Sequence, residues 1–230
     1  MIGVIANCIT VIIGSIIGMT FKNYIPKRVT DAIMIGIGLC TLHIGISGAL
    51  SGENTLVLIF SVAIGAVIGT LIDLDGKINK LAEFVTKKTK KSDDNTNVAQ
   101  GFVTASLLFC VGSMTVVGSI QAGVSGDNTL LFTKSLLDLI SAIALSATFG
   151  VGVLLSCAFV LVFQGGLVLL SQFIAPFLTG SIQNELICAG SVLIIGLGLN
   201  IIGVSKIKVA NYMPAMLIAP LITPLFNLLV

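Results

Sequence analysis

The chain has 230 residues, of which 56% are hydrophobic and 10% charged, and its mean hydropathy is +1.11. Soluble domains contain about 25% charged residues, so this composition excludes an ordinary soluble domain and predicts a single membrane domain over residues 1–230. The length suits seven or eight transmembrane helices of roughly 20 residues each. The net charge of +2 is small, and we expect the lipid bilayer as a partner and no nucleic acid.

Eight apolar windows, taken in chain order, predict an all-α, polytopic transmembrane bundle of eight helices. The windows lie at residues 2–21, 31–50, 55–74, 100–123, 130–149, 151–173, 186–204 and 209–229. The first window has no basic segment before it and no small-residue cleavage site. We therefore interpret it as a retained helix and not as a signal peptide.

Basic residues predict the orientation of these helices. The loop 76–98 carries six Lys residues, and the positive-inside rule places it in the cytoplasm. Alternation of eight spans places the other basic clusters on the same side; these are Lys22, Lys27, Arg28, Lys206 and Lys208. A seven-span alternative stays open, in which residues 130–149 are re-entrant or interfacial. It would move the last two Lys residues outside, against the rule.

Two stretches of the sequence repeat. Residues 36–56 match residues 110–130 without a gap at eight of 21 positions, and both end in a near-identical turn, SGENTL or SGDNTL. Residues 9–18 match residues 60–69 at five of ten positions. We therefore interpret the first two pairs of windows as two copies of one helical hairpin.

The two predicted hairpins are residues 1–50 and 55–123, and the second contains the Lys-rich loop. Residues 151–204 resemble a third and fainter copy. If residues 130–149 cross the membrane, this third copy is inverted relative to the first. Inverted repeats of this kind are typical of transporters.

The five cysteines all lie in apolar segments; they are Cys8, Cys40, Cys110, Cys157 and Cys188. None forms a C-x-x-C pair and their number is odd, so the pattern indicates free buried thiols and no disulfide framework or zinc site. We expect no cofactor and no metal.

Polar residues inside the windows are candidates for a transport pathway. The repeated faces Gly38-x-x-Thr41 and Gly112-x-x-Thr115 combine a small residue with a neutral oxygen ligand, which suits an alkali cation or a small polar solute; interhelical hydrogen bonding is the alternative. A lone His43 is either a proton-relay residue or a hydrogen-bonded packing residue. In chain order, the candidate pathway residues are Asn7, Thr41, His43, Ser113, Thr115, Lys134, Asp138, Gln164, Asn200 and Asn211.

Lys134 and Asp138 are the least conventional of these residues because they place two charges in one apolar window. A 1.5 Å rise per residue puts Asp138 close to the middle of the bilayer. A charge at that depth costs roughly 2.5–3.5 kcal/mol on insertion scales. The spacing of four allows an ion pair. A structural pair and a functional gate, ion site or proton site both stay open.

Three stretches of the sequence resemble a known family. They are Gly3-x-x-x-Asn7, FVTASLLFCVGSMTVVGSIQAG (102–123) and especially LLFTKSLLDLISAIALSATFGVGVLLS (130–156). They are similar to bacterial inner-membrane proteins of the domain-of-unknown-function 554 family. The resemblance implies a multi-pass protein of the bacterial cytoplasmic membrane, and it supplies no substrate or catalytic residue.

The pattern favours a transporter or channel for a small ion or small polar solute. A non-transporting scaffold or regulatory protein is the alternative. An intramembrane enzyme is a distant third, because one histidine and one clearly intramembrane aspartate exclude multi-His and paired-carboxylate sites. We expect no catalytic residue and no enzyme. Gly-rich helix faces favour a homo-oligomer.

Overall fold

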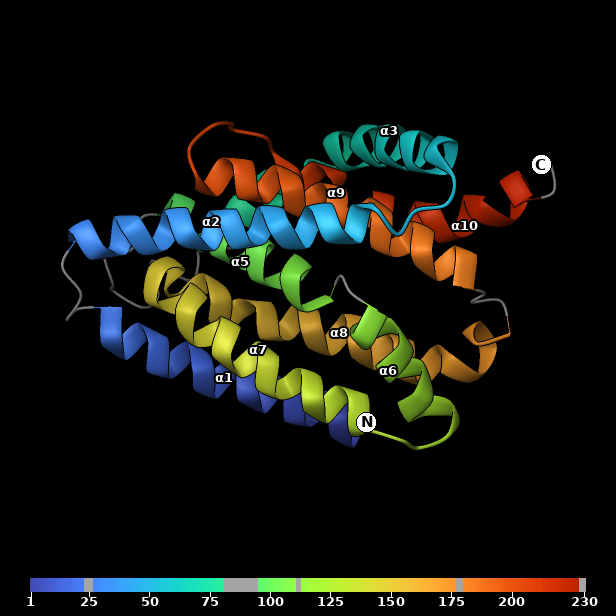
Figure 1. Cartoon of the computed structure of the whole chain (residues 1–230), viewed down its shortest axis with the longest axis horizontal. Helices are drawn as coiled ribbons and strands as arrows, with labels where there is room; N and C mark the ends of the chain where they lie inside the picture. The colour runs from blue at the N-terminus through green and yellow to red at the C-terminus, as the bar shows by residue number, and fades with distance from the viewer. Residues whose placement is uncertain (23–26, 81–94, 111–112, 177–179, 228–230) are drawn as a thin grey trace. The chain divides into compact units, whose positions relative to one another are not determined.

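The computed structural model describes residues 1–22, 27–80, 95–110, 113–176 and 180–227, and these residues form helices joined by short turns without a β-strand. The all-α prediction is confirmed (Figure 1). The elements are α1 (Ile2–Lys22), α2 (Lys27–Ala49), α3 (Thr55–Leu71), α5 (Asn95–Cys110), α6 (Ser113–Val124), α7 (Thr129–Phe149), α8 (Val151–Ile174), α9 (Gly180–Ile201), the 3-10 turn η1 (Val209–Tyr212) and α10 (Ala215–Asn227). A short helix, Leu74–Lys80, follows α3.

The described residues contain five to seven candidate membrane spans. Five of the described helical segments are long and apolar enough to cross a membrane, and two bent pairs raise the number to seven if each pair is one span. The five include α7, the window that the seven-span alternative treated as re-entrant. The apolar part of α2 in the described residues, Met34–Ala49, is shorter than these five segments. Eight spans are therefore not confirmed.

The described helices group into two compact units. The first unit, Met1–Ala32 and Asn79–Phe177, contains α1, α5, α6, α7 and α8. In this unit α1 packs along α7, and α8 packs against α1, α5 and α6. The second unit, Ile33–Ile78 and Leu178–Val230, contains most of α2 together with α3, α9, η1 and α10.

Small residues set the close packing of α1 on α7. A Cβ atom on Gly14 would lie 2.6 Å from the Leu139 carbonyl oxygen, and one on Gly18 would collide with the Ser146 hydroxyl group. Only glycine fits at these two positions of α1, so the two backbones can approach closely. The polar residues of α1 and α7 are thereby held side by side.

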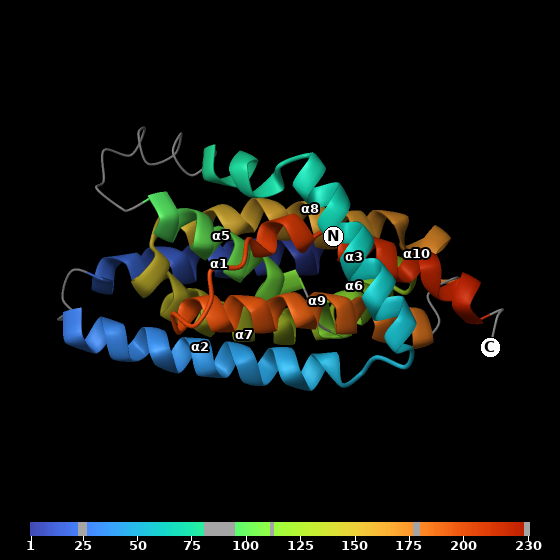
Figure 2. The ribbon, with the colours of Figure 1, turned by 90° about the horizontal axis from the view of Figure 1, so that it is seen from above.

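In the second unit, α2 lies alongside α9 (Figure 2), and a Cβ atom on Gly45 of α2 would lie 2.8 Å from the backbone nitrogen of Ile195 in α9. A small apolar core joins α3, α9 and α10 through Val57, Ala189 and Ala219. This unit therefore also rests on close helix contacts between small residues.

The predicted internal repeat is not confirmed. Residues 36–49 are the end of the continuous helix α2, whereas the matching residues 110–123 contain the end of α5 and most of α6. The helices on either side of residues 111–112, Val98–Cys110 and Met114–Val124, are bent by 59°. The central residues of the Lys-rich loop, 81–94, lie outside the described residues.

Candidate functional site

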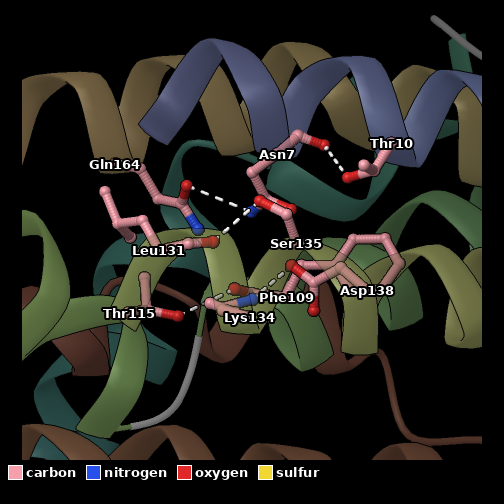
Figure 3. A network of polar contacts seen from close by, with 9 residues as sticks. All are labelled: Asn7, Thr10, Phe109, Thr115, Leu131, Lys134, Ser135, Asp138 and Gln164. Atoms are coloured by element: carbon pink, nitrogen blue, oxygen red, sulfur yellow. Dashed lines mark hydrogen bonds and ion pairs between the residues drawn. The ribbon is translucent and has the colours of Figure 1, made fainter. Parts of the chain in front are cut away.

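The first unit holds a buried group of polar side chains, which we call the polar core. It consists of Asn7 on α1, Lys134, Ser135 and Asp138 on α7, and Gln164 on α8, each no more than 6% exposed. Figure 3 shows these side chains beside Phe109 of α5 and Thr115 of α6. Helices α1, α7 and α8 of one unit therefore contribute to a single polar site, and α5 and α6 border it.

Lys134 and Asp138 form an ion pair one helical turn apart in α7. Both residues lie on the buried face of α7 and are 6% exposed. The Lys134 ammonium nitrogen also lies 5.8 Å from the centroid of the Phe109 ring, within the range of a cation–π interaction. A buried pair is stable only while both partners remain, because loss of one leaves an uncompensated charge at a cost of about 3–5 kcal/mol.

Asn7 and Gln164 form a second buried pair, between α1 and α8. The Asn7 side-chain amide donates to the Gln164 amide oxygen at 3.1 Å, and Asn7 also interacts with the Asp138 carboxyl group. The Asn7 Oδ1 and Gln164 Nε2 atoms have no hydrogen-bond partner. If both amides are turned over, the pair still forms. In either orientation it leaves one N–H donor and one acceptor oxygen for another group.

The bend between α5 and α6 lies next to this pair of charges. The Thr115 hydroxyl group donates to the Phe109 carbonyl oxygen at 3.0 Å, which satisfies one backbone group at the end of α5. Bent or broken helices place backbone polar groups inside a membrane protein only where protein or a cavity surrounds them. Here the end of α5 faces the ammonium group of Lys134.

Unpartnered polar atoms concentrate in the first unit. Nine buried side-chain nitrogen or oxygen atoms of the described residues have no hydrogen-bond partner, and eight of these belong to the first unit. The eight are Asn7 Oδ1, Ser15 Oγ, Thr104 Oγ1, Ser106 Oγ, Ser119 Oγ, Thr148 Oγ1, Gln164 Nε2 and Ser171 Oγ. Native structures rarely leave such atoms unsatisfied, so this unit offers places for a polar ligand or for water.

Half of the sequence-predicted pathway residues meet in or beside the polar core. They are Asn7, Thr115, Lys134, Asp138 and Gln164. Ser113 begins α6, and its side chain lies outside the described residues. Ser135, which was not predicted, donates to the Leu131 carbonyl oxygen at 2.7 Å. In the sequence, Ser135 lies in the stretch 130–156 that carries the family resemblance, but nothing marked it as a pathway residue.

The other four predicted residues lie in the second unit, where three of them form hydrogen bonds with backbone groups. Thr41 donates to the Ile37 carbonyl oxygen within α2, and Asn200 binds the backbone of Ile207 through both of its side-chain polar atoms. The Asn211 side-chain oxygen accepts from the Asp75 backbone nitrogen at 2.9 Å. His43 is exposed. Their assignment to a pathway stays a prediction.

Sequence analysis did not single out Glu185, which lies just before the predicted window 186–204. The side chain is 1% exposed, and its Oε1 atom accepts hydrogen bonds from the backbone nitrogens of Glu53 and Asn54, each at 2.7 Å. The available signal was a single acidic residue six positions into an apolar helix. No group of three or more His, Cys, Asp or Glu side chains in the described ranges is arranged to hold a metal ion.

Comparison with known proteins identifies the family. The family described as "Protein of unknown function (DUF554)" matches residues 2–224. The chain belongs to this family. It is 34% identical over 226 residues to the uncharacterized membrane protein YdfK of Bacillus subtilis strain 168, covering 96% of this chain and 95% of YdfK. This DUF554 chain is therefore a membrane protein with several apolar helices.

A second relative is more distant. The uncharacterized protein YqgA of Escherichia coli strain K12 is 27% identical over 221 residues, covering 95% of this chain and 94% of YqgA. No solved structure matches the chain.

Proposed function

We propose that this DUF554 protein is a transporter or channel for a small ion or small polar solute. The observation that carries the proposal is the buried Lys134–Asp138 pair next to the bend between α5 and α6. Ionisable residues inside a membrane bundle are rare and mark ion or substrate pathways. Interrupted helices mark binding sites in many transporters. Both features occur in one unit.

The energetics support a role for the pair beyond packing. Apolar side chains of similar volume give the same or greater stability than a buried ion pair in many proteins. The chain instead places Lys134 and Asp138 on the buried face of an otherwise apolar helix and surrounds them with the Asn7–Gln164 pair. A polar solute that crosses this unit would lose its hydration shell, and these side chains would replace part of it.

The proposal includes the location of the protein. We propose that it lies in the bacterial cytoplasmic membrane, contacts the lipid bilayer, and keeps the Lys-rich loop 76–98 in the cytoplasm, as the positive-inside rule predicts. The Gly-rich helix faces favour a homo-oligomer. The sequence repeats support a duplicated origin of the helical hairpins. No enzymatic activity is part of the proposal.

Flux measurements on purified protein in liposomes test this function. Wild-type vesicles should carry at least one member of a panel of labelled cations, anions and amino acids. Lys134→Met and Asp138→Asn should each abolish that flux. The double variant should fold, because it removes both buried charges together, yet carry no flux. Thr133→Ala changes the neighbouring exposed residue and should retain wild-type flux.

Two outcomes would contradict the proposal. A double variant with wild-type flux would make the ion pair a purely structural feature. Folded wild-type protein without flux of any member of the panel would favour the non-transporting scaffold.

A further inference from the structure

The charge balance of the polar core restricts what can bind there. Lys134 and Asp138 are the only charged residues in α1, α5, α6, α7 and α8 apart from Lys22 at the end of α1. A charge that a ligand brings among these five helices must therefore be balanced by this pair. In a low-dielectric site an unbalanced charge is costly. A charged ligand requires one of the two residues to change its protonation state.

The surroundings of the pair favour charged Lys134 over charged Asp138. Lys134 keeps the Phe109 ring as a neighbour when Asp138 is neutral. Both residues interact electrostatically with Cys110, the last residue of α5. The carboxyl end of a helix carries a partial negative charge. That end stabilises a neighbouring ammonium group and destabilises a neighbouring carboxylate. The proton that balances a ligand therefore goes to Asp138.

The Asn7–Gln164 pair can follow this change in protonation. In the orientation observed, the Asn7 amide nitrogen donates to Gln164, and the Asn7 side chain interacts with Asp138. If both amides turn over, Gln164 donates to Asn7, and the Asn7 oxygen becomes an acceptor. An acceptor in that place suits the O–H group of a protonated Asp138. The outer atoms of the two amides, Asn7 Oδ1 and Gln164 Nε2, have no hydrogen-bond partner. Turning both amides over therefore breaks no other hydrogen bond of these two atoms.

The other titratable groups near the pair are thiols. Cys110 faces it from α5, and Cys8 of α1 faces Cys157 of α8, with each thiol donating to the carbonyl oxygen of the other residue. Helix α6 contributes no titratable side chain. Protonation of Asp138 therefore releases the Lys134 ammonium group from its ion pair.

We propose that the polar core binds a small monovalent anion at Lys134 together with one proton at Asp138. The proton adds to the Asp138 carboxylate and breaks its ion pair, and the anion takes the place of the carboxylate beside the ammonium group. The net charge of the site stays at zero before and after loading. This inference rests on the proposed transport function and names its substrate class and its coupling ion: one anion and one proton move in the same direction.

Anion-dependent thermal stability of the full chain in detergent tests this site, with nitrate as the probe and the bulky anion gluconate as the reference at constant sodium. Nitrate should raise the Tm of wild-type protein at about pH 5 and much less at about pH 8, because its affinity falls up to tenfold per pH unit when binding requires a proton. A ligand at about ten times its Kd should raise the Tm by about 3–6 °C.

Two variants separate the roles of the charges. Asp138→Asn mimics the protonated acid, so nitrate should stabilise it equally at both pH values. Lys134→Met should lose the nitrate effect at both. Cys110→Ala removes the neighbouring thiol and should keep the pH dependence. Nitrate stabilisation of Lys134→Met equal to that of the wild type would overturn the anion site, and wild-type pH dependence in Asp138→Asn would overturn the proton site.

Vesicles distinguish this inference from the proposed function. An inward nitrate gradient should acidify the lumen of wild-type proteoliposomes without a membrane potential. Nitrate binding without flux of any solute would support the site and contradict transport. Flux of a cation without nitrate binding would support transport and overturn the anion–proton site.

Discussion

The two turns with nearly the same sequence, SGENTL at residues 51–56 and SGDNTL at residues 125–130, are stabilised in different ways. In the second unit, the buried Glu185 of α9 accepts from two backbone nitrogens of the turn. In the first unit, the exposed Asp127 of the turn itself accepts from the backbone nitrogen and hydroxyl group of Thr129. In both turns a carboxylate accepts hydrogen bonds from residues of the turn. The carboxylate is buried and distant in the sequence in one unit, and exposed and adjacent in the other.

The two buried acids of the described residues, Glu185 and Asp138, have different roles. Glu185 is committed to backbone hydrogen bonds at the start of α3, whereas Asp138 holds no backbone group in the described contacts and is paired with Lys134. Hydrogen bonds from Thr129, the first residue of α7, hold the pKa of the exposed Asp127 carboxyl group below its usual range. Asp138 is therefore free to change its protonation state without unfolding a turn.

The largest expected effect is the coupling between Lys134 and Asp138. Lys134→Met or Asp138→Asn alone leaves one buried charge unpaired and should lower the free energy of unfolding by about 3–5 kcal/mol. The double variant should recover most of that loss, because no charge remains. Denaturant titration of the four proteins in one detergent measures the coupling. Additive losses in the double variant would show that the two charges do not interact in the folded state.

The second effect concerns Glu185, whose contribution to stability should come from its hydrogen bonds and not from its charge. Glu185→Ala leaves two backbone N–H groups without an acceptor, at a cost of about 1–3 kcal/mol for each buried group. Glu185→Gln keeps an acceptor oxygen and should lose much less. Glu53→Gln is the control, because that carboxylate is exposed. Equal losses in Glu185→Ala and Glu185→Gln would mean that the charge of Glu185 matters more than its hydrogen bonds.

The contrast between the acids explains what the sequence could predict. Lys134 and Asp138 are four residues apart, so helical periodicity alone places them together on one face. The helical windows follow from apolar length in the same way. Glu185 meets the turn at residues 51–56 only through tertiary packing of α9, and spacing along the chain carries no information about that contact. The sequence also could not predict the bend between α5 and α6, because the matching residues of α2 form a continuous helix.

The smallest expected effect concerns the asparagine that the two turns share, Asn54 in one and Asn128 in the other. Asn54 accepts from the Leu56 backbone nitrogen at 3.0 Å and caps α3, whereas Asn128 makes no cap within α7 and accepts from the Gly3 backbone nitrogen of α1 at 3.0 Å. Asn54→Ala should therefore cost about 1 kcal/mol, as loss of a helix cap does.

Asn128→Ala should cost about the same through a different contact, because the Gly3 nitrogen loses its acceptor at the start of α1. Hydrogen exchange separates the two: the amide of Leu56 should exchange faster only in Asn54→Ala, and the amide of Gly3 only in Asn128→Ala. Asp127→Asn, which alters an exposed side chain of the same turn, should change neither amide. Faster exchange at Thr129 and Leu130 in Asn128→Ala would show that Asn128 caps α7 after all, and the two turns would then be equivalent.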